Sequence, residues 1–97
     1  MRVLRPQLLK AFWVASPDAE RALRAWFHEA KRAAWRNPAE LKAQYRSASI
    51  LKSSRAIFNI CGNKYRLVVA IDFRAQLVVV RWIGRHVDYD DINVETV

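Results

Sequence analysis

Residues 57–89 read IFNICGNKYRLVVAIDFRAQLVVVRWIGRHVDY, a stretch in which a few cations are set into apolar runs. Its alternation of β-branched, aromatic and polar residues predicts three consecutive strands, at residues 56–60, 65–72 and 77–84. Gly62-Asn63 predicts a hairpin turn, because both residues tolerate a positive φ. Apolar residues fall on both faces of the last two strands, which predicts that these strands are central in the sheet.

Two arginines interrupt the predicted strands, Arg66 in the second and Arg81 in the third. A buried charge must be paired or must face a cleft. One interpretation of Arg66 is a structural ion pair with Asp72 or with a carboxylate on a helix. The other is a cation presented on an open face of the sheet. Arg81 allows the same two interpretations, but it belongs to the other set of alternating positions in its strand.

The residues before this stretch predict helices that cover one face of the sheet. The expected order is a short edge strand at residues 1–4, helices at 6–16, 17–34 and 39–45, and a short strand or loop at 46–54. Ser16 and Asn37 are the expected helix caps, since each precedes a proline that suits a first helical turn. The elements predict an α+β fold, and the length leaves room for one domain, residues 1–97.

The composition is strongly basic. The chain has 17 Lys and Arg against 9 Asp and Glu, which gives a net charge of +8 and a pI near 10.4. A field of this sign attracts polyanions, largely through release of their counterions. Aromatic side chains that can stack on bases accompany the cations, so nucleic acid is a better candidate partner than the alternative, a solvated basic surface with no dedicated partner.

Several classes of protein are excluded by what the sequence lacks. Cys61 is the single cysteine, which rules out an internal disulfide and fits a reducing, cytoplasmic environment. Residues 1–10 lack the apolar core of a signal peptide, and no run approaches the ~18 apolar residues of a membrane span, so no membrane partner is expected. The carboxylates around the one histidine of residues 84–91 are not a standard metal site, and no cofactor motif is present.

The segments 58–67 and 83–90 resemble the HigB-type toxins of bacterial toxin–antitoxin systems, within the RelE-like superfamily. The segments 13–20, 35–40, 44–49 and 95–97 are also similar to that family, so the resemblance covers nearly the whole chain. It implies a RelE-like α+β fold, with helices on one face of a twisted, mainly antiparallel sheet and a basic open face. It also implies an endoribonuclease that cleaves mRNA on translating ribosomes, and a helix-turn-helix antitoxin of the HigA type.

The resemblance implies roles for three residues in metal-independent cleavage, in which the 2′-hydroxyl of RNA attacks the adjacent phosphate. Arg66 corresponds to the strand arginine of the superfamily and is expected to stabilise charge on that phosphate. His86 is expected to transfer protons, and Tyr89 to orient the 2′-hydroxyl, stack on a base or share the proton transfer. The cations expected to hold the RNA backbone or ribosomal RNA are Lys52, Arg55, Lys64 and Arg85.

The sequence departs from the family in the triplet Gly84-Arg85-His86, where relatives often carry Gly-Thr-His. Alternatives also stay open. His86 could serve only to order the tail through Asp88 or Asp90, and Tyr89 could be an aromatic that packs against the sheet. A ParE-like toxin that inhibits DNA gyrase shares the fold, although such toxins generally lack the His and Tyr pair. The last alternative is an RNA-binding module without catalysis.

Overall fold

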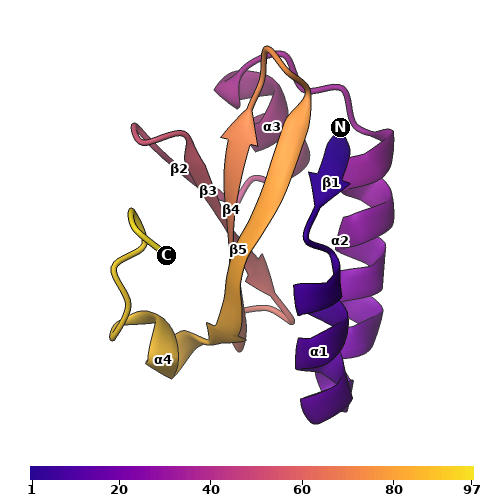
Figure 1. The fold of residues 1–97 in the computed structure, drawn as a ribbon, viewed down its shortest axis with the longest axis vertical. Coiled ribbons are helices and arrows are strands. Elements are labelled where there is room, and N and C mark those ends of the chain that lie inside the picture. Colours follow the sequence, from indigo (N-terminus) through magenta and orange to yellow (C-terminus); the bar gives the residue numbers. More distant parts are fainter.

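Five strands form one mixed sheet in the order β1-β5-β4-β3-β2, in a computed structural model that describes residues 1–97 (Figure 1). The elements in chain order are β1 Arg2–Leu4, α1 Gln7–Ala15, the 3-10 turn η1 Pro17–Ala19, α2 Glu20–Arg32, α3 Pro38–Gln44, β2 Ser49–Leu51, β3 Arg55–Ile60, β4 Tyr65–Asp72, β5 Leu77–Arg85 and α4 His86–Tyr89. All neighbours pair antiparallel except β1 and β5, which are parallel. The α+β, RelE-like fold class predicted from the sequence is confirmed.

Helices α1 and α2 lie on one side of the sheet, and the chain after α4 lies on the opposite side (Figure 1). The helical side holds a core cluster of 17 buried residues, to which α2 contributes Leu23, Trp26 and Ala30. These residues recur at helical spacing, so they form one apolar stripe, and Lys31 and Arg32 fall in the last turn where the helix dipole favours cations. Burial of this stripe fixes α2 to the sheet.

The two predicted helix caps have different outcomes. The Asn37 side chain accepts a hydrogen bond from the Glu40 backbone N–H at 3.0 Å, so this cap is confirmed. The Ser16 cap is wrong, because its side chain makes no capping bond. Residues 17–19 first form the 3-10 turn η1, and α2 begins only at Glu20. Ala19 is buried in the core, which holds this tighter turn in place.

The turn between β3 and β4 also differs from its prediction. It spans residues 61–64, and the residues with positive φ are Cys61 at 54° and Gly62 at 66°. The Lys64 N–H closes the turn on the Cys61 carbonyl at 3.3 Å. Asn63 therefore does not take the left-handed conformation expected of it. The Asn63 carbonyl oxygen contacts the Nδ1 atom of His86.

Residues of β4 alternate between the two faces of the sheet. Tyr65, Leu67, Val69 and Ile71 belong to the core on the helical side. Because successive side chains of a strand point to opposite faces, Arg66, Val68 and Ala70 lie on the other one, which we call the open face. Val68 is fully buried yet lies outside the core cluster, so the open face is partly covered.

A β-bulge in β5 interrupts this regular alternation. Val69 pairs with Val80 and Val68 pairs with Trp82, so Arg81 has no partner on β4. A bulge re-aims the side chains next to it. Val80 contributes to the core, whereas Trp82 is opposite Val68 on the open face.

No helix of the molecule is both long and apolar enough to span a membrane.

Candidate active site

Arg66 lies on the open face of β4, the middle strand, near the start of that strand and between Asn59 of β3 and Gly84 of β5. None of the four ion pairs of the molecule includes Arg66, and its Nε atom is buried without a hydrogen-bond partner. The interpretation as an ion pair with Asp72 is therefore wrong, because the Asp72 carboxylate instead accepts from the Ala75 N–H at 2.9 Å. Arg66 keeps N–H donors for an external acceptor.

His86 begins the short helix α4 directly after β5. Its backbone N–H donates to the Lys64 carbonyl at 2.9 Å, and its Nδ1 lies 3.2 Å from the Asn63 carbonyl oxygen. Because a carbonyl only accepts, Nδ1 carries a hydrogen in this contact. Nε2 lies 3.4 Å from Nη2 of Arg66, which only donates, so the neutral ring turns its lone pair toward Arg66. The turn before β4 thus sets the tautomer of His86.

Tyr89 follows His86 by three positions on α4, a spacing that brings two side chains to the same face of a helix. The centre of its ring lies 4.9 Å from Cζ of Arg66, which is a cation–π contact. The ring of Trp82 also lies next to it, with ring centres 6.2 Å apart and planes at 60°. The structure therefore brings Arg66, His86 and Tyr89 together.

Trp82 is the member of this site that the sequence analysis missed. A Cβ atom added at Gly84 would meet two ring atoms of Trp82 at 2.6 Å, so the ring lies across the glycine. Glycine in a strand often marks such a close approach. The signal was present in the sequence as a glycine two residues after a tryptophan. The ring gives the site a second aromatic surface, next to Tyr89.

Two of the predicted RNA-binding cations lie beside His86, and both are paired. Lys64 forms an ion pair with Asp18, and Arg85 forms one with Asp88 at 2.8 Å. Hydrogen bonds from Lys64 and then from Tyr65 lower the pKa of the Asp18 carboxyl, and the hydrogen bond from Arg85 lowers the pKa of Asp88. The residues around a shallow hollow at this end of the sheet are Asn63, Lys64, Arg85, His86, Val87 and Asp90.

The other two predicted cations, Lys52 and Arg55, are not brought to this end. Arg55 pairs across the sheet with Ala70, which is four residues along β4 from Arg66. At ~3.3 Å per residue, the two rows are ~13 Å apart. Lys52 lies in the exposed turn that precedes β3. The predicted set therefore divides between the two ends of the open face.

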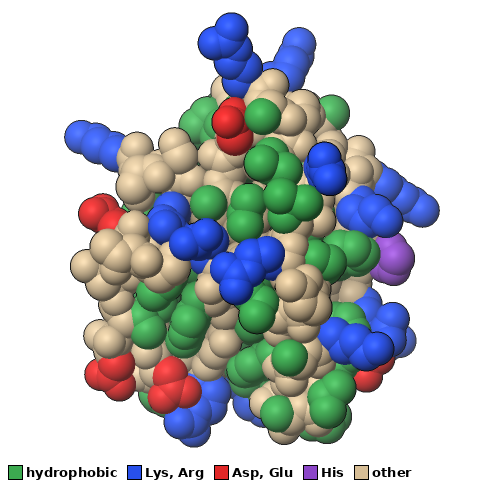
Figure 2. Space-filling view, viewed as in Figure 1, with side chains coloured by type: hydrophobic (Ala, Val, Ile, Leu, Met, Phe, Trp, Pro, Cys, Tyr) green, Lys and Arg blue, Asp and Glu red, His purple; other side chains and the backbone are tan.

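The surface charge is unevenly balanced. Figure 2 shows Lys and Arg side chains around the outline of the molecule and, near the centre of the view, others that lie among hydrophobic side chains; Asp and Glu side chains are fewer. The half-buried rings of Trp82 and Tyr89, with Arg66 beside them, suit stacking and backbone contacts with a single-stranded nucleic acid. No group of three or more His, Cys, Asp or Glu side chains is arranged to hold a metal ion.

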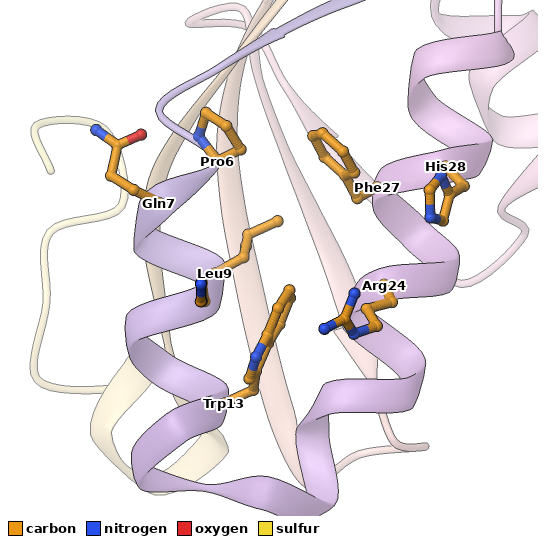
Figure 3. A pocket seen from close by; sticks show the side chains of 8 residues that line it. Pro6, Gln7, Leu9, Trp13, Arg24, Phe27 and His28 are labelled. Carbon is orange, nitrogen blue, oxygen red and sulfur yellow. The ribbon is translucent and has the colours of Figure 1, made fainter.

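A second hollow lies between α1 and α2, on the helical side of the sheet (Figure 3). Trp13 points from α1 toward α2, where Cζ of Arg24 lies 4.8 Å from its ring centre. His28 lies exposed at the rim of this hollow, next to Phe27. The hollow is separated from Arg66 by the sheet and the core, so it is not part of the candidate active site.

The fold and the site together define the class of protein to which this chain belongs. A small α+β domain with helices on one face of the sheet, and with cations and aromatics on the other, is a RelE-like protein. The family model for the HigB toxin, the RelE-like toxic component of a toxin–antitoxin system, matches residues 19–92. The chain belongs to this family, and the resemblance seen in the sequence is confirmed. No curated protein matches the chain closely.

Membership in this family makes the chain a toxin of a toxin–antitoxin system and implies an antitoxin as its partner. RelE-like toxins suggest ribonuclease activity in general terms. The family match does not assign roles to individual residues.

Proposed function

We propose that this toxin is an endoribonuclease that cleaves mRNA on translating ribosomes, through attack of the RNA 2′-hydroxyl on the adjacent phosphate. The observation that carries the proposal is the state of Arg66. Its guanidinium has no carboxylate partner, and it is held between a histidine and a tyrosine on the open face. A planar, permanently charged fork in this position suits two oxygens of a phosphate group.

Charge on the phosphate increases as the 2′-oxygen attacks and the 5′-oxygen leaves. Fixed donors aimed at that charge usually supply the largest share of catalysis. Arg66 is the donor in this proposal. Its place on a central strand limits its movement, so it needs no large rearrangement when the charge develops.

Proton transfer falls to His86 in this proposal. The Asn63 carbonyl holds the hydrogen on Nδ1, so Nε2 presents a lone pair beside Arg66, where a bound phosphate would lie. From that position Nε2 can take the proton of the 2′-hydroxyl. Tyr89 supplies the ring over Arg66, and its hydroxyl can orient the ribose or give a proton to the 5′-oxygen that leaves, a proton that water supplies otherwise. Trp82 would support this ring and stack on a neighbouring base.

The partner in this proposal is a helix-turn-helix antitoxin of the HigA type, and the site of action is the cytoplasm, where translating ribosomes are found. Lys64 and Arg85 flank His86 and would contact RNA backbone or ribosomal RNA. Their ion pairs with Asp18 and Asp88 are exposed, so exchange of the carboxylates for phosphates would cost little.

The test adds purified protein to a translating extract and maps new 5′ ends of the mRNA by primer extension. His86→Ala should lower the rate of cleavage about 100-fold or more, because a general base contributes at least that much. The chain has two histidines, so His28→Ala on the helical side is the matched control and should cleave normally. A reaction without ribosomes measures the ribosome requirement.

The outcomes separate the alternatives. New ends in codon register that require both His86 and ribosomes would support the whole proposal. Ends that persist without ribosomes would keep the nuclease and remove the ribosome requirement. If folded protein produced no new ends, the proposal would fail, and a supercoiling assay would then test the gyrase-directed alternative. RNA binding without cleavage would point to a non-catalytic module.

A further inference from the structure

Two arginines on the open face share one acceptor at a distance from the candidate active site. Nη1 of Arg55 lies 2.7 Å from the main-chain oxygen of Val97, and Nε of Arg81 lies 2.9 Å from the same oxygen. Neither arginine takes part in any of the four ion pairs. Two like charges directed at one point repel each other, so this arrangement favours an anionic or strongly polar acceptor between them.

The fold explains how the two side chains converge. Arg55 lies on β3 opposite Ala70, and Ala70 in turn lies opposite Val79 of β5. Arg81 is the unpaired residue of the bulge in β5, and such a residue is free to aim its side chain away from the regular alternation. The two arginines therefore reach toward each other across β4, on the same face as Arg66.

The oxygen between them belongs to residues 90–97, a segment without helix or strand, which we call the tail. The two arginine contacts are the hydrogen bonds that join the tail to the sheet. The other hydrogen bonds of residues 91–97 are made within residues 88–97, for example from the Thr96 and Val97 N–H groups to the Asn93 carbonyl. The tail lies on the side of the sheet opposite α1 and α2 (Figure 1). Ile92, Val94 and Val97 of the tail are half-buried, so its release requires loss of the two arginine contacts and exposure of these apolar side chains.

We propose that Arg55 and Arg81 form a second phosphate site, which binds a backbone phosphate of RNA that flanks the scissile one. In the free protein, the Val97 oxygen occupies this site. The inference rests on the proposed function, because it assumes an RNA strand on the open face. The rows of Arg55 and Arg66 on the sheet are ~13 Å apart, and the Arg66 guanidinium contacts His86 whereas that of Arg55 contacts Val97, so the two sites are distinct. Two forks that converge on one oxygen are the arrangement that binds phosphate well.

The first experiment measures binding of a short single-stranded RNA with 2′-O-methyl groups at every nucleotide, which has no hydroxyl to attack. Arg81→Gln and Arg55→Gln should each raise the Kd about tenfold, the loss expected for a charge-assisted hydrogen bond. Each should also reduce the slope of log K against log salt by about one. Arg21→Gln is the matched control, since Arg21 is exposed on α2 on the helical side and loses the same charge; its Kd should barely change. An effect of Arg21→Gln equal to that of Arg81→Gln would overturn the proposal.

Arg81→Lys guards against a variant that is merely misfolded. It keeps the charge and most of the side-chain length but loses the planar fork, so the proposal predicts an intermediate affinity. Thermal unfolding of each variant shows whether it is folded. If Arg81→Lys bound as the unaltered protein does, a directed two-fork site would be excluded.

The second experiment follows amide hydrogen exchange with and without the same RNA. Release of the tail predicts faster exchange at the Thr96 and Val97 amides in the complex, while amides of β4 stay protected. Slower exchange in the tail would overturn its occupancy of the site. Because this RNA cannot be cleaved, the result is independent of catalysis. Cleavage that survives Arg81→Gln with normal affinity would leave the proposed function intact and remove the second site.

Discussion

The two faces of β4 carry different kinds of residue at adjacent positions. Leu67 is fully buried in the cluster that closes the helical side. Arg66, one position earlier, is half-buried on the open face with no acidic partner. One face therefore gains stability from burial, while the other keeps charges that stability does not require. A strand with this division allows the fold and the site to be altered separately.

Leu67→Ala tests the stabilising face and should have the largest effect. Removing a fully buried leucine side chain leaves a cavity and costs about 2–5 kcal/mol of unfolding free energy. The measurement is urea denaturation followed by tryptophan fluorescence, since Trp26 and Trp35 belong to the same core. The fraction that stays folded should cleave RNA at a normal rate. A change below 1 kcal/mol would show that the two faces are not so distinct.

Arg66→Ala tests the open face. Loss of a fixed donor to the reacting phosphate should slow cleavage roughly 100- to 1,000-fold, by analogy with removal of one oxyanion donor. The unfolding free energy should change little, because the buried Nε loses no hydrogen bond. Single-turnover cleavage and urea denaturation of the same sample give both numbers. Equal losses of stability and activity would mean that Arg66 is structural.

Much of the helical face could be predicted from the sequence. The β4 strand has the bounds that its alternation predicts, residues 65–72, and α2 lies within the helix predicted for residues 17–34. Burial on one face imposes a period, and a period is readable in a sequence. The prediction of Ser16 as a cap failed because the competing 3-10 turn depends on burial of Ala19, a tertiary contact.

The open face was harder to predict. The family resemblance pointed to Arg66, His86 and Tyr89, and the structure places them together, but no residue pattern indicated that Asn63 would orient His86. The aim of Arg81 depends on a bulge, which arises only when β4 and β5 pair. The features of this face arise from strand pairing and from one turn. Neither of these produces a periodic pattern of apolar residues in the sequence.

Gly84→Ala tests whether the open face also contains a position where close packing matters. The new Cβ would meet the ring of Trp82 at 2.6 Å, so the ring must move, at a cost of about 1–3 kcal/mol in stability. Movement of Trp82 should displace Tyr89 and weaken cleavage. Near-ultraviolet circular dichroism, which reports the aromatic environment, should change with it.

A double-mutant cycle with Trp82→Ala separates this contact from general damage to the strand. Trp82→Ala removes the three atoms nearest to the added methyl, so Gly84→Ala should cost far less in that background. Additive losses would show that the glycine is needed for another reason.

The second glycine, Gly62, has open space around it but a φ of 66°, so Gly62→Ala should cost about 1 kcal/mol through backbone strain alone.

Asp18→Asn is expected to have the smallest effect, and it probes the link between the two faces. Asp18 lies in η1 on the helical side, and its carboxylate accepts hydrogen bonds from Lys64 and, at 2.6 Å, from the Tyr65 hydroxyl. These contacts hold the turn whose carbonyls orient His86. Removing the charge should lower the melting temperature slightly at neutral pH, because the ion pair is exposed.

The effect of Asp18→Asn on the melting temperature should depend on pH, in a direction that follows from the pKa of Asp18. The pKa of Asp18 in the folded protein lies below its ordinary value of 3.8, chiefly because Lys64 donates a hydrogen bond to the carboxylate. The stability from this contact is therefore fully present above the ordinary value and is lost as the pH falls through the lower folded value. The difference in melting temperature between the unaltered protein and Asp18→Asn should be constant near neutral pH and should narrow below about pH 4. Asp91→Asn, at a carboxylate without an ion pair, is the control. A difference that stayed constant into the acid range would show that the charge of Asp18 does not link the helical side to the turn beneath His86.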